Sequence, residues 1–311
     1  MARNVRYMKL KPPKANKDML QDSRFSVIGH IVMILLSVMA VVPFVLLITS
    51  SLTENSSIVR NGYSFVPKEW SLEAYKYLFN NGSQIVHAYL ITIISTLMGT
   101  FTSILISTML AYPLSRKDFV FRKPLAFLVV FSILFHGGMV PTYLVYTTII
   151  NIKNTIWAQV MPSLMNGFYV LLIRTYYMTS IPTEIIEAAK IDGATEMRAF
   201  WRIILPLSVP ILASVGLLVG IGYWNNWYNG LLFVTESKYM SIQNILNQMM
   251  TNIQYLSSGA AAGEIKVSTQ DLPSYTVQMA IGVVGALPII VSYPFFQRYF
   301  IKGIAIGAVK G

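Results

Sequence analysis

Charged side chains gather in one stretch, Ser180–Pro210, which lies between long apolar runs. It holds four of the chain's 13 acids (Glu184, Glu187, Asp192 and Glu196) and the bases Lys190, Arg198 and Arg202. The stretch contains neither histidine nor cysteine. Its residue types therefore favour ion pairing between exposed carboxylates and the basic side chains of a partner over acid–base or nucleophilic catalysis.

Local signals within Ser180–Pro210 predict two short helices joined by a tight turn. Pro182 suits a first helical turn, and Asp192-Gly193 is a helix stop because Gly accepts positive φ. Thr195 predicts the N-cap of the second helix, with Glu196 near the positive end of its dipole. That helix has an apolar face at i, i+3, i+4, i+7 spacing: Met197, Phe200, Trp201 and Ile204. Pro206 and Pro210 then predict its end.

A second group combines aromatic rings with amides, which suits a sugar because rings stack on C–H faces while amides hydrogen-bond hydroxyls. Its candidate substrate-path residues are Tyr223, Trp224, Asn225, Trp227 and Tyr228. The alternative is an interfacial belt, since Trp and Tyr concentrate at membrane surfaces. The sequence leaves both interpretations open. Nearby, Gly216 and Gly220 have small-xxx-small spacing, which permits close helix packing.

Several kinds of chemistry are disfavoured. No G-x-x-x-x-G-K-[S/T] loop is present, so any ATP hydrolysis must belong to another chain, and we expect no cofactor or metal on this one. His30, His87 and His136 each stand alone, without an H-E-x-x-H pattern. The acids all lie outside the predicted membrane spans, which argues against a proton- or sodium-coupled carrier.

The elements that must position these residues are membrane helices. The chain is 54% hydrophobic and 12% charged, whereas an ordinary soluble domain is about 25% charged. About 20 apolar residues are needed to cross the hydrocarbon of a bilayer. Six runs qualify, and they predict an all-α membrane protein with spans at about 26–50, 85–112, 124–146, 156–173, 209–233 and 275–296.

The net charge of +11 is distributed unevenly. With the N-terminus inside and six alternating spans, 18 of the 24 lysines and arginines fall on the inner side. By the positive-inside rule, this predicts a multi-pass protein of the bacterial cytoplasmic membrane with both termini cytoplasmic. The same distribution explains the net charge without any binding of nucleic acid. Nucleic-acid binding is the alternative role for the basic N-terminal segment.

The predicted organisation follows from these spans. A basic cytoplasmic segment, 1–25, precedes a transmembrane domain, 26–296, and a cytoplasmic tail, 297–311. Within the domain, the loop 180–210 is cytoplasmic and the polar loop 235–274 is extracytoplasmic.

One motif in the cytoplasmic loop has long, fixed spacing. The motif begins with Glu187-Ala188-Ala189 and continues with Gly193 after three residues, Ile203 after nine more, and Leu205-Pro206 after one more. This spacing resembles the "EAA" loop of ATP-binding-cassette (ABC) importer permeases. The end of the chain, Gln297-Arg298 to Gly303 and Val309-Lys310-Gly311, resembles that of the smaller maltose-type permeases. Ile191-Asp192-Gly193-Ala194 is similar to the Gram-positive complex-oligosaccharide branch. Without that spacing, an amphipathic hairpin on the membrane would be the simplest interpretation.

The resemblance implies a type I ABC importer permease fold with a cytoplasmic coupling helix. It also implies a complex with a second permease subunit, two ATPase subunits that bind ATP and magnesium, and an extracytoplasmic sugar-binding protein, embedded in membrane lipid. It assigns ATPase coupling to Glu184, Glu187, Ala188, Ala189, Asp192, Gly193, Phe200, Leu205 and Pro206. The implied function is import of a sugar, and we expect an oligosaccharide. Alternatives are import of a peptide or polyamine by the same architecture, or a non-transporting membrane scaffold or sensor.

Overall fold

The computed structural model describes residues 23–80, 82–257 and 274–308. Across these ranges the chain is helical, and its strand-like pairing is a single isolated bridge between Thr53 and Trp70. Most of the predicted N-terminal segment 1–25, part of the outer loop 235–274 and the last three residues lie outside the described residues.

The helices vary from single turns to rods of 35 residues. In chain order they are α1 (Ser23–Ser51), α2 (Asn55–Asn61), α3 (Glu73–Phe79), α4 (Gly82–Ser115), α5 (Arg122–Leu134), α6 (Met139–Leu144), α7 (Trp157–Val160), α8 (Gly167–Ser180), α9 (Thr183–Ile191), α10 (Glu196–Ala199), α11 (Leu205–Leu207), α12 (Val209–Trp224), α13 (Tyr228–Phe233), α14 (Ile242–Ser257) and α15 (Ser274–Ala308). Residues 145–149 and 200–204 are π-helical.

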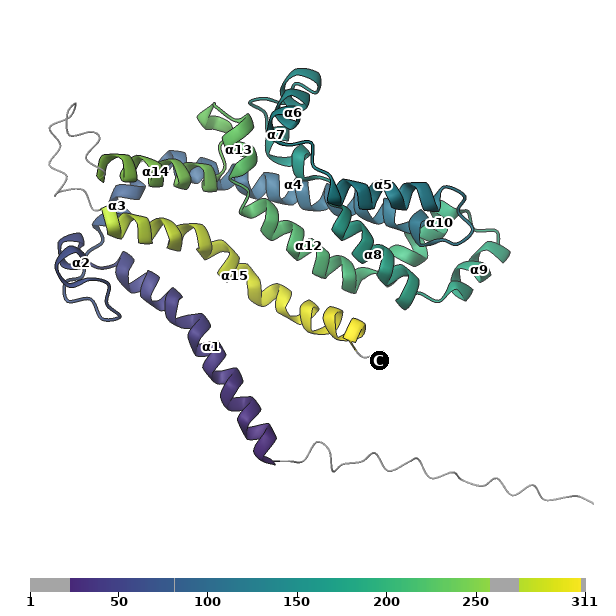
Figure 1. The fold of residues 1–311 in the computed structure, drawn as a ribbon, viewed down its shortest axis with the longest axis horizontal. Coiled ribbons are helices and arrows are strands. Elements are labelled where there is room, and N and C mark those ends of the chain that lie inside the picture. The colour runs from purple at the N-terminus through teal and green to yellow at the C-terminus, as the bar shows by residue number, and fades with distance from the viewer. Residues whose placement is uncertain (1–22, 81, 258–273, 309–311) are drawn as a thin grey trace, which may run out of the picture.

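The long helix α4 is the centre of the packing, with α8 and α12 along its length and the short helices α9 and α10 near its C-terminal end (Figure 1). Small residues permit this close approach. A Cβ added at Gly216 of α12 would lie 2.9 Å from the side chain of Ile104, and one at Gly220 would lie 3.5 Å from Thr100. The glycine pair noted in the sequence thus packs against α4 of the same chain.

Helix α1 is exposed along its apolar stretch. Val27–Ser51 has a mean hydropathy of 3.1, and none of the residues in its most apolar window is buried. Figure 1 shows α1 extending away from the body formed by α4, α8 and α12, with α15 lying between α1 and α12. An apolar helix without a protein cover needs lipid or another chain around it.

By length and composition, two described helices could cross a membrane: Val27–Ser51 and Gly82–Ser115. Two bent pairs raise that number to four if each pair is one span. Arg122–Leu134 and Met139–Ile149 meet at 113°, and Glu196–Leu207 and Val209–Trp224 meet at 78°. The shorter apolar helix Tyr275–Val291 lies within α15.

Three of the expected spans are not continuous helices. Within 124–146 the helix ends at Leu134, and Gly138 has a φ of 85° before α6 begins. The run 156–173 is divided between α7, a 3₁₀ turn and α8. The run 209–233 is interrupted at 225–227, between α12 and α13. Beyond the predicted span 275–296, the backbone stays helical to Ala308, so most of the expected tail continues α15.

Candidate functional site

The charged stretch forms a helical hairpin, made of α9, the turn 192–195, α10 and the helical residues 200–207. We call residues 183–207 the α9–α10 hairpin. Gly193 has a φ of 80° and ends α9, as its sequence position predicts. The hydroxyl of Thr195 accepts a hydrogen bond from the backbone N–H of Arg198, which confirms the predicted N-cap. Pro182 lies one position earlier than expected, as the N-cap of α9.

The residues expected to couple to an ATPase divide into an outer and an inner group. Exposed are Glu184, Glu187, Ala188, Asp192, Gly193 and Pro206; Ala189 and Leu205 are half-buried. Phe200 is buried, and with Ile186 and Ile204 it joins the apolar cluster below the hairpin. The outer group is therefore free to meet another molecule, while the inner group fixes the hairpin to the rest of the chain.

The predicted apolar face of the second helix is only half covered. Phe200 and Ile204 are buried, whereas Met197 and Trp201 are 56% and 45% exposed. Three of these four residues lie in the π-helical turn 200–204, whose wider turn departs from the α-helical spacing on which the predicted face was based. Met197 and Trp201 remain in contact with each other through Nε1 and Sδ, 3.1 Å apart.

A hollow of about 690 Å³ lies between α9, the end of α8 and the turn that follows α4. Its polar lining includes Glu184, Glu187 and Lys190 from α9 and Arg116 and Asp118 from the turn. Glu184 and Glu187 have no ion-pair partner within the part of the chain that the structure describes. This hollow, the α9 hollow, thus combines fixed walls with two unpaired carboxylates.

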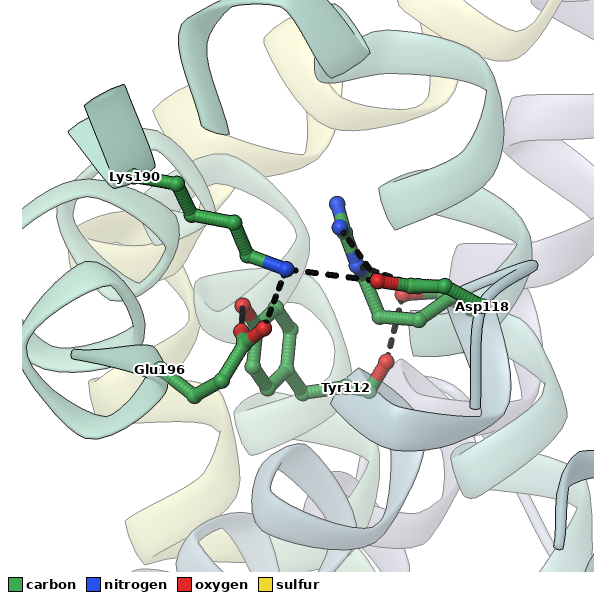
Figure 2. Close-up of polar contacts among 6 residues, drawn as sticks. Tyr112, Asp118, Lys190 and Glu196 are labelled. Atoms are coloured by element: carbon green, nitrogen blue, oxygen red, sulfur yellow. Dashed lines mark hydrogen bonds and ion pairs between the residues drawn. The ribbon is translucent and has the colours of Figure 1, made fainter. Parts of the chain in front are cut away.

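Five side chains form a continuous polar network beside the α9 hollow (Figure 2). We call it the Lys190 network; its members are Tyr112, Arg116, Asp118, Lys190 and Glu196. The Nζ of Lys190 lies 3.2 Å from Oδ2 of Asp118 and 2.5 Å from Oε1 of Glu196. The Tyr112 hydroxyl donates to Oε2 of Glu196 at 2.6 Å, and Arg116 donates to both oxygens of Asp118.

The network keeps its acids and bases ionised. Hydrogen bonds from Arg116, and a further one from Lys190, lower the pKa of Asp118 to about 2. The hydrogen bond to Glu196 raises the pKa of Lys190. Partial burial of Glu196 opposes its ionisation, but hydrogen bonds from Lys190 and Tyr112 outweigh it and lower its pKa. The charges at this end of the molecule are therefore fixed near neutral pH.

Sequence analysis did not connect Tyr112, Arg116 and Asp118 with the hairpin. They are separated from Glu196 and Lys190 by 72 to 84 positions. The one local signal is Asp118, an acid in the basic turn 116–118, but only the lysines and arginines of such turns entered the charge count.

The aromatic and amide residues form a second hollow, of about 310 Å³, which we call the aromatic hollow. The structure brings Asn225, Trp227 and Tyr228 together there. It adds Ser163, Asn166 and Tyr169 from the region before and within α8, which sequence analysis missed because they lie about 60 positions earlier. Asn229 and Asn226 both donate to the Ser163 hydroxyl, at 3.1 and 3.3 Å, which holds the two segments together.

Two predicted path residues have structural partners. Tyr223 touches the aromatic hollow but is 5% exposed, and its hydroxyl donates to the carbonyl of Val160 at 3.1 Å. Trp224 lies away from this hollow: its Nε1 donates to the carbonyl of Gly285 at 3.2 Å, and its ring contacts that of Tyr89. Trp227 and Tyr228, in contrast, are 44% and 45% exposed.

Comparison with known proteins gives the class and the family of this helical chain, which is a membrane component of a transport system. Residues 19–306 match the family described as "Binding-protein-dependent transport system inner membrane component". The match covers most of the chain, and the chain belongs to this family of ABC importer permeases, a family of transport components.

Individual relatives align over nearly their full lengths. The chain is 33% identical to the polygalacturonan/rhamnogalacturonan transport system permease protein YtcP of Bacillus subtilis, over 94% of this chain and 100% of that protein. It is 30% identical to the arabinooligosaccharides transport system permease protein AraQ of Halalkalibacterium halodurans, over 88% and 92% of the two chains.

A solved structure has the same fold. It is the crystal structure of a bacterial ABC transporter involved in the import of the acidic polysaccharide alginate. One of its chains superimposes with a TM-score of 0.74 at 24% sequence identity, covering 93% of this chain and 100% of that one. The comparison therefore supports the permease fold.

Proposed function

We propose that the chain is a transmembrane subunit of an ATP-driven importer of an oligosaccharide, and that its α9–α10 hairpin docks on a separate ATPase. The observation that carries the proposal is the exposed pair of acids Glu184 and Glu187, which make no ion pair within the described residues and lie on a helix anchored in the apolar cluster by Ile186. A rigid helix with unpaired carboxylates suits a partner surface that offers basic side chains.

The residues around these acids suit close docking. Ala188 and Asp192 are exposed, and Ala189 is half-buried, so small side chains allow another backbone to approach α9. Ile185 and Ile191 add exposed apolar area, 41% and 86% exposed. Gly193 gives the sharp turn, while Phe200, Leu205 and Pro206 shape the second limb of the hairpin.

In this proposal the chain crosses the membrane six times. The spans are α1, α4, the bent pair 122–149, the run 157–180, the run from α12 to α13, and the first part of α15. The distribution of lysine and arginine puts both termini and the hairpin in the cytoplasm. ATP and magnesium belong to the partner ATPase, and an extracytoplasmic binding protein would deliver the solute to a path shared with a second permease subunit.

The substrate class follows from the relatives. Polygalacturonan/rhamnogalacturonan, arabinooligosaccharides and alginate appear in the names of the proteins that this chain resembles. Amides, hydroxyls and exposed rings line the aromatic hollow, and none of its lining residues in the described part of the chain is charged. This lining supports contact with a sugar and offers no fixed charge for a polyamine.

Purification of the complex from its native membrane tests the proposal. We expect an ATPase, a second permease subunit and a solute-binding protein to copurify with the chain. ATP hydrolysis by the complex should rise when the binding protein is loaded with oligosaccharides from pectin, arabinan or alginate. A complex without an ATPase would refute the proposal, and stimulation by peptides or polyamines alone would refute its sugar component.

A further inference from the structure

The Lys190 network joins segments that the chain itself does not connect directly. Tyr112 lies near the end of α4, Asp118 lies in the turn after it, Lys190 lies in the last turn of α9, and Glu196 begins α10. Lys190 therefore bridges both limbs of the α9–α10 hairpin, across the turn 192–195, and binds the α4 side at the same time (Figure 2).

The end of α4 is itself held in place by two other arginines. The carbonyl oxygen of Leu114 accepts hydrogen bonds from Nε of Arg122, at 3.1 Å, and from Nε of Arg174, at 3.0 Å. These cations come from α5 and α8 and lie at the negative end of the α4 dipole. The network is thus attached to a fixed point of the helical body.

An apolar layer holds the hairpin independently of these charges. Ile186 and Ile204 are buried, and the ring of Phe200 packs on that of Tyr112 with centroids 5.5 Å apart. Asp118 and Glu196 have side chains that are 57% and 53% exposed, so each ion pair is partly screened by water. Removing a charge should consequently leave the hairpin folded but change how firmly it is held.

The peptide connection from the hairpin to α12 is not straight. The helical residues 196–207 meet α12 at an angle of 78° around Ser208. Through the backbone, a displacement of α9 reaches α8 directly by way of Ile181 and Pro182. In the other direction it passes the turn 192–195 and then this bend before it reaches α12. The Lys190 network connects α9 to α4 before either the turn or the bend.

We propose that Lys190 is a positioning residue that makes the α9–α10 hairpin move as one body with α4. Displacement of the hairpin then reaches α4 through the side chains of the network, in addition to α8 and α12, which it reaches through the backbone. The inference rests on the proposed docking of an ATPase, and it assigns to α4 a part in coupling that the peptide chain alone would leave to α8 and α12.

Spin labels can measure this connection, because the chain contains no cysteine. Val120, in the turn after α4, and Arg198, in α10, are exposed, and both can be replaced by cysteine for labelling in the complex purified from its membrane. We expect a narrow distribution of distances between the two labels. The distribution should be the same in the nucleotide-free complex and in the complex trapped with Mg-ATP and vanadate. Lys190→Met should broaden the distribution, and Lys190→Arg, which keeps the charge and its donors, should restore it.

The matched control is Lys117→Met, which removes a positive charge from the turn after α4, next to Asp118. Lys117 is exposed and makes no ion pair within the described residues. The number of ATP molecules consumed per sugar imported should rise about two- to fivefold in Lys190→Met. This is the factor by which the loss of one exposed ion pair changes an equilibrium constant. The number should stay unchanged in the control.

The outcomes separate this inference from the proposed function. A Lys190→Met distribution as narrow as that of the unsubstituted chain, in the absence of nucleotide, would overturn the positioning role whether or not an ATPase binds. A broadened distribution in a complex that lacks an ATPase would keep the mechanical connection and refute the docking proposal. Equal broadening in Lys117→Met would also overturn the inference, since the effect would then be one of net charge.

Discussion

Gly99 of α4 lies directly against the phenol ring of Tyr223 of α12. A Cβ at position 99 would stand 2.5 Å from Cζ of the ring, and the ring has little freedom to retreat because its hydroxyl donates to the carbonyl of Val160. The contact between the two helices therefore depends on the absence of a side chain at position 99.

Gly99→Ala should destabilise the protein by about 1–3 kcal/mol, the usual cost of overpacking. Thermal unfolding of the purified complex in detergent would measure the change. Gly222→Ala in α12 is the control, because no heavy atom lies within 4 Å of the added Cβ and alanine favours the helix. Equal melting temperatures for the two variants would contradict the packing argument.

Gly193→Ala should impair coupling through the backbone. A non-glycine residue at a φ of 80° costs about 1–2 kcal/mol, and relaxation of that strain would change the angle between α9 and α10. Gly193→Pro should act more strongly, since it also removes the N–H that donates to the carbonyl of Lys190. Transport per ATP hydrolysed is the measurement.

Gly62→Ala supplies the control for backbone strain. Gly62 has a φ of 74° and open space around it, but it ends α2, far along the chain from the hairpin. It should lower the melting temperature as Gly193→Ala does while leaving transport per ATP unchanged. Coupling at the unsubstituted level in Gly193→Pro, with the chain present in the membrane, would eliminate the proposed role of the turn.

Glu187→Arg should weaken binding of the ATPase. The substitution reverses an exposed charge that has no ion-pair partner within the described residues, so it should leave folding unchanged. Loss of an interfacial charge pair and the repulsion that replaces it should reduce affinity at least about tenfold. Copurification of the ATPase with the variant tests this, with Glu73→Arg in α3 as an exposed-acid control. Undiminished recovery of the ATPase would count against docking at α9.

The neighbouring tryptophans should behave differently. Trp227→Ala removes an exposed ring from the aromatic hollow and should reduce sugar uptake without lowering the melting temperature. Trp224→Ala removes a half-buried ring together with its hydrogen bond to Gly285 and should cost about 2 kcal/mol of stability. If neither variant changes uptake, the aromatic residues form a membrane-interface belt.

The Lys190 network should be insensitive to pH between about 5 and 9. The folded-state pKa of Asp118 is about 2, below the usual value, so its contribution is complete above the ordinary aspartate range and is lost as the pH falls toward 2. The pKa of Glu196 is also lowered, so its contribution to stability is likewise lost only as the pH falls. The pKa of Lys190 is raised, so its contribution is complete below the ordinary lysine value and is lost only above it. Spin-label distances measured across this range should coincide, and a transition near neutral pH would contradict these assignments.

Local sequence signals predicted the hairpin well because each depends on a few adjacent residues. The conformation at Gly193 and the cap at Thr195 follow from steric freedom and from one hydroxyl three positions before an N–H. The family resemblance came from the same stretch, and the match over residues 19–306 confirmed it.

Hydropathy could not predict where the apolar runs are interrupted. An average over about 20 residues is nearly the same for a straight helix and for two helices that meet at 113°. Nor could it separate Trp224 from Trp227, which differ in what they contact rather than in type. The contacts that join the hairpin side of the Lys190 network to its α4 side are more than 70 positions apart, and one sequence carries no signal for them.

The length of α4 has a consequence for where the network lies. Its 34 residues span about 51 Å, whereas the hydrocarbon layer is about 30 Å thick. Moderate tilt absorbs only part of the excess, so the helix must project well beyond the hydrocarbon. Arg116 and Asp118 follow the end of α4, where ionised groups favour water over lipid tails. In the proposed orientation, helix α4 thus acts as a spacer that holds its charged end outside the hydrocarbon layer, on the side where the proposed ATPase would dock.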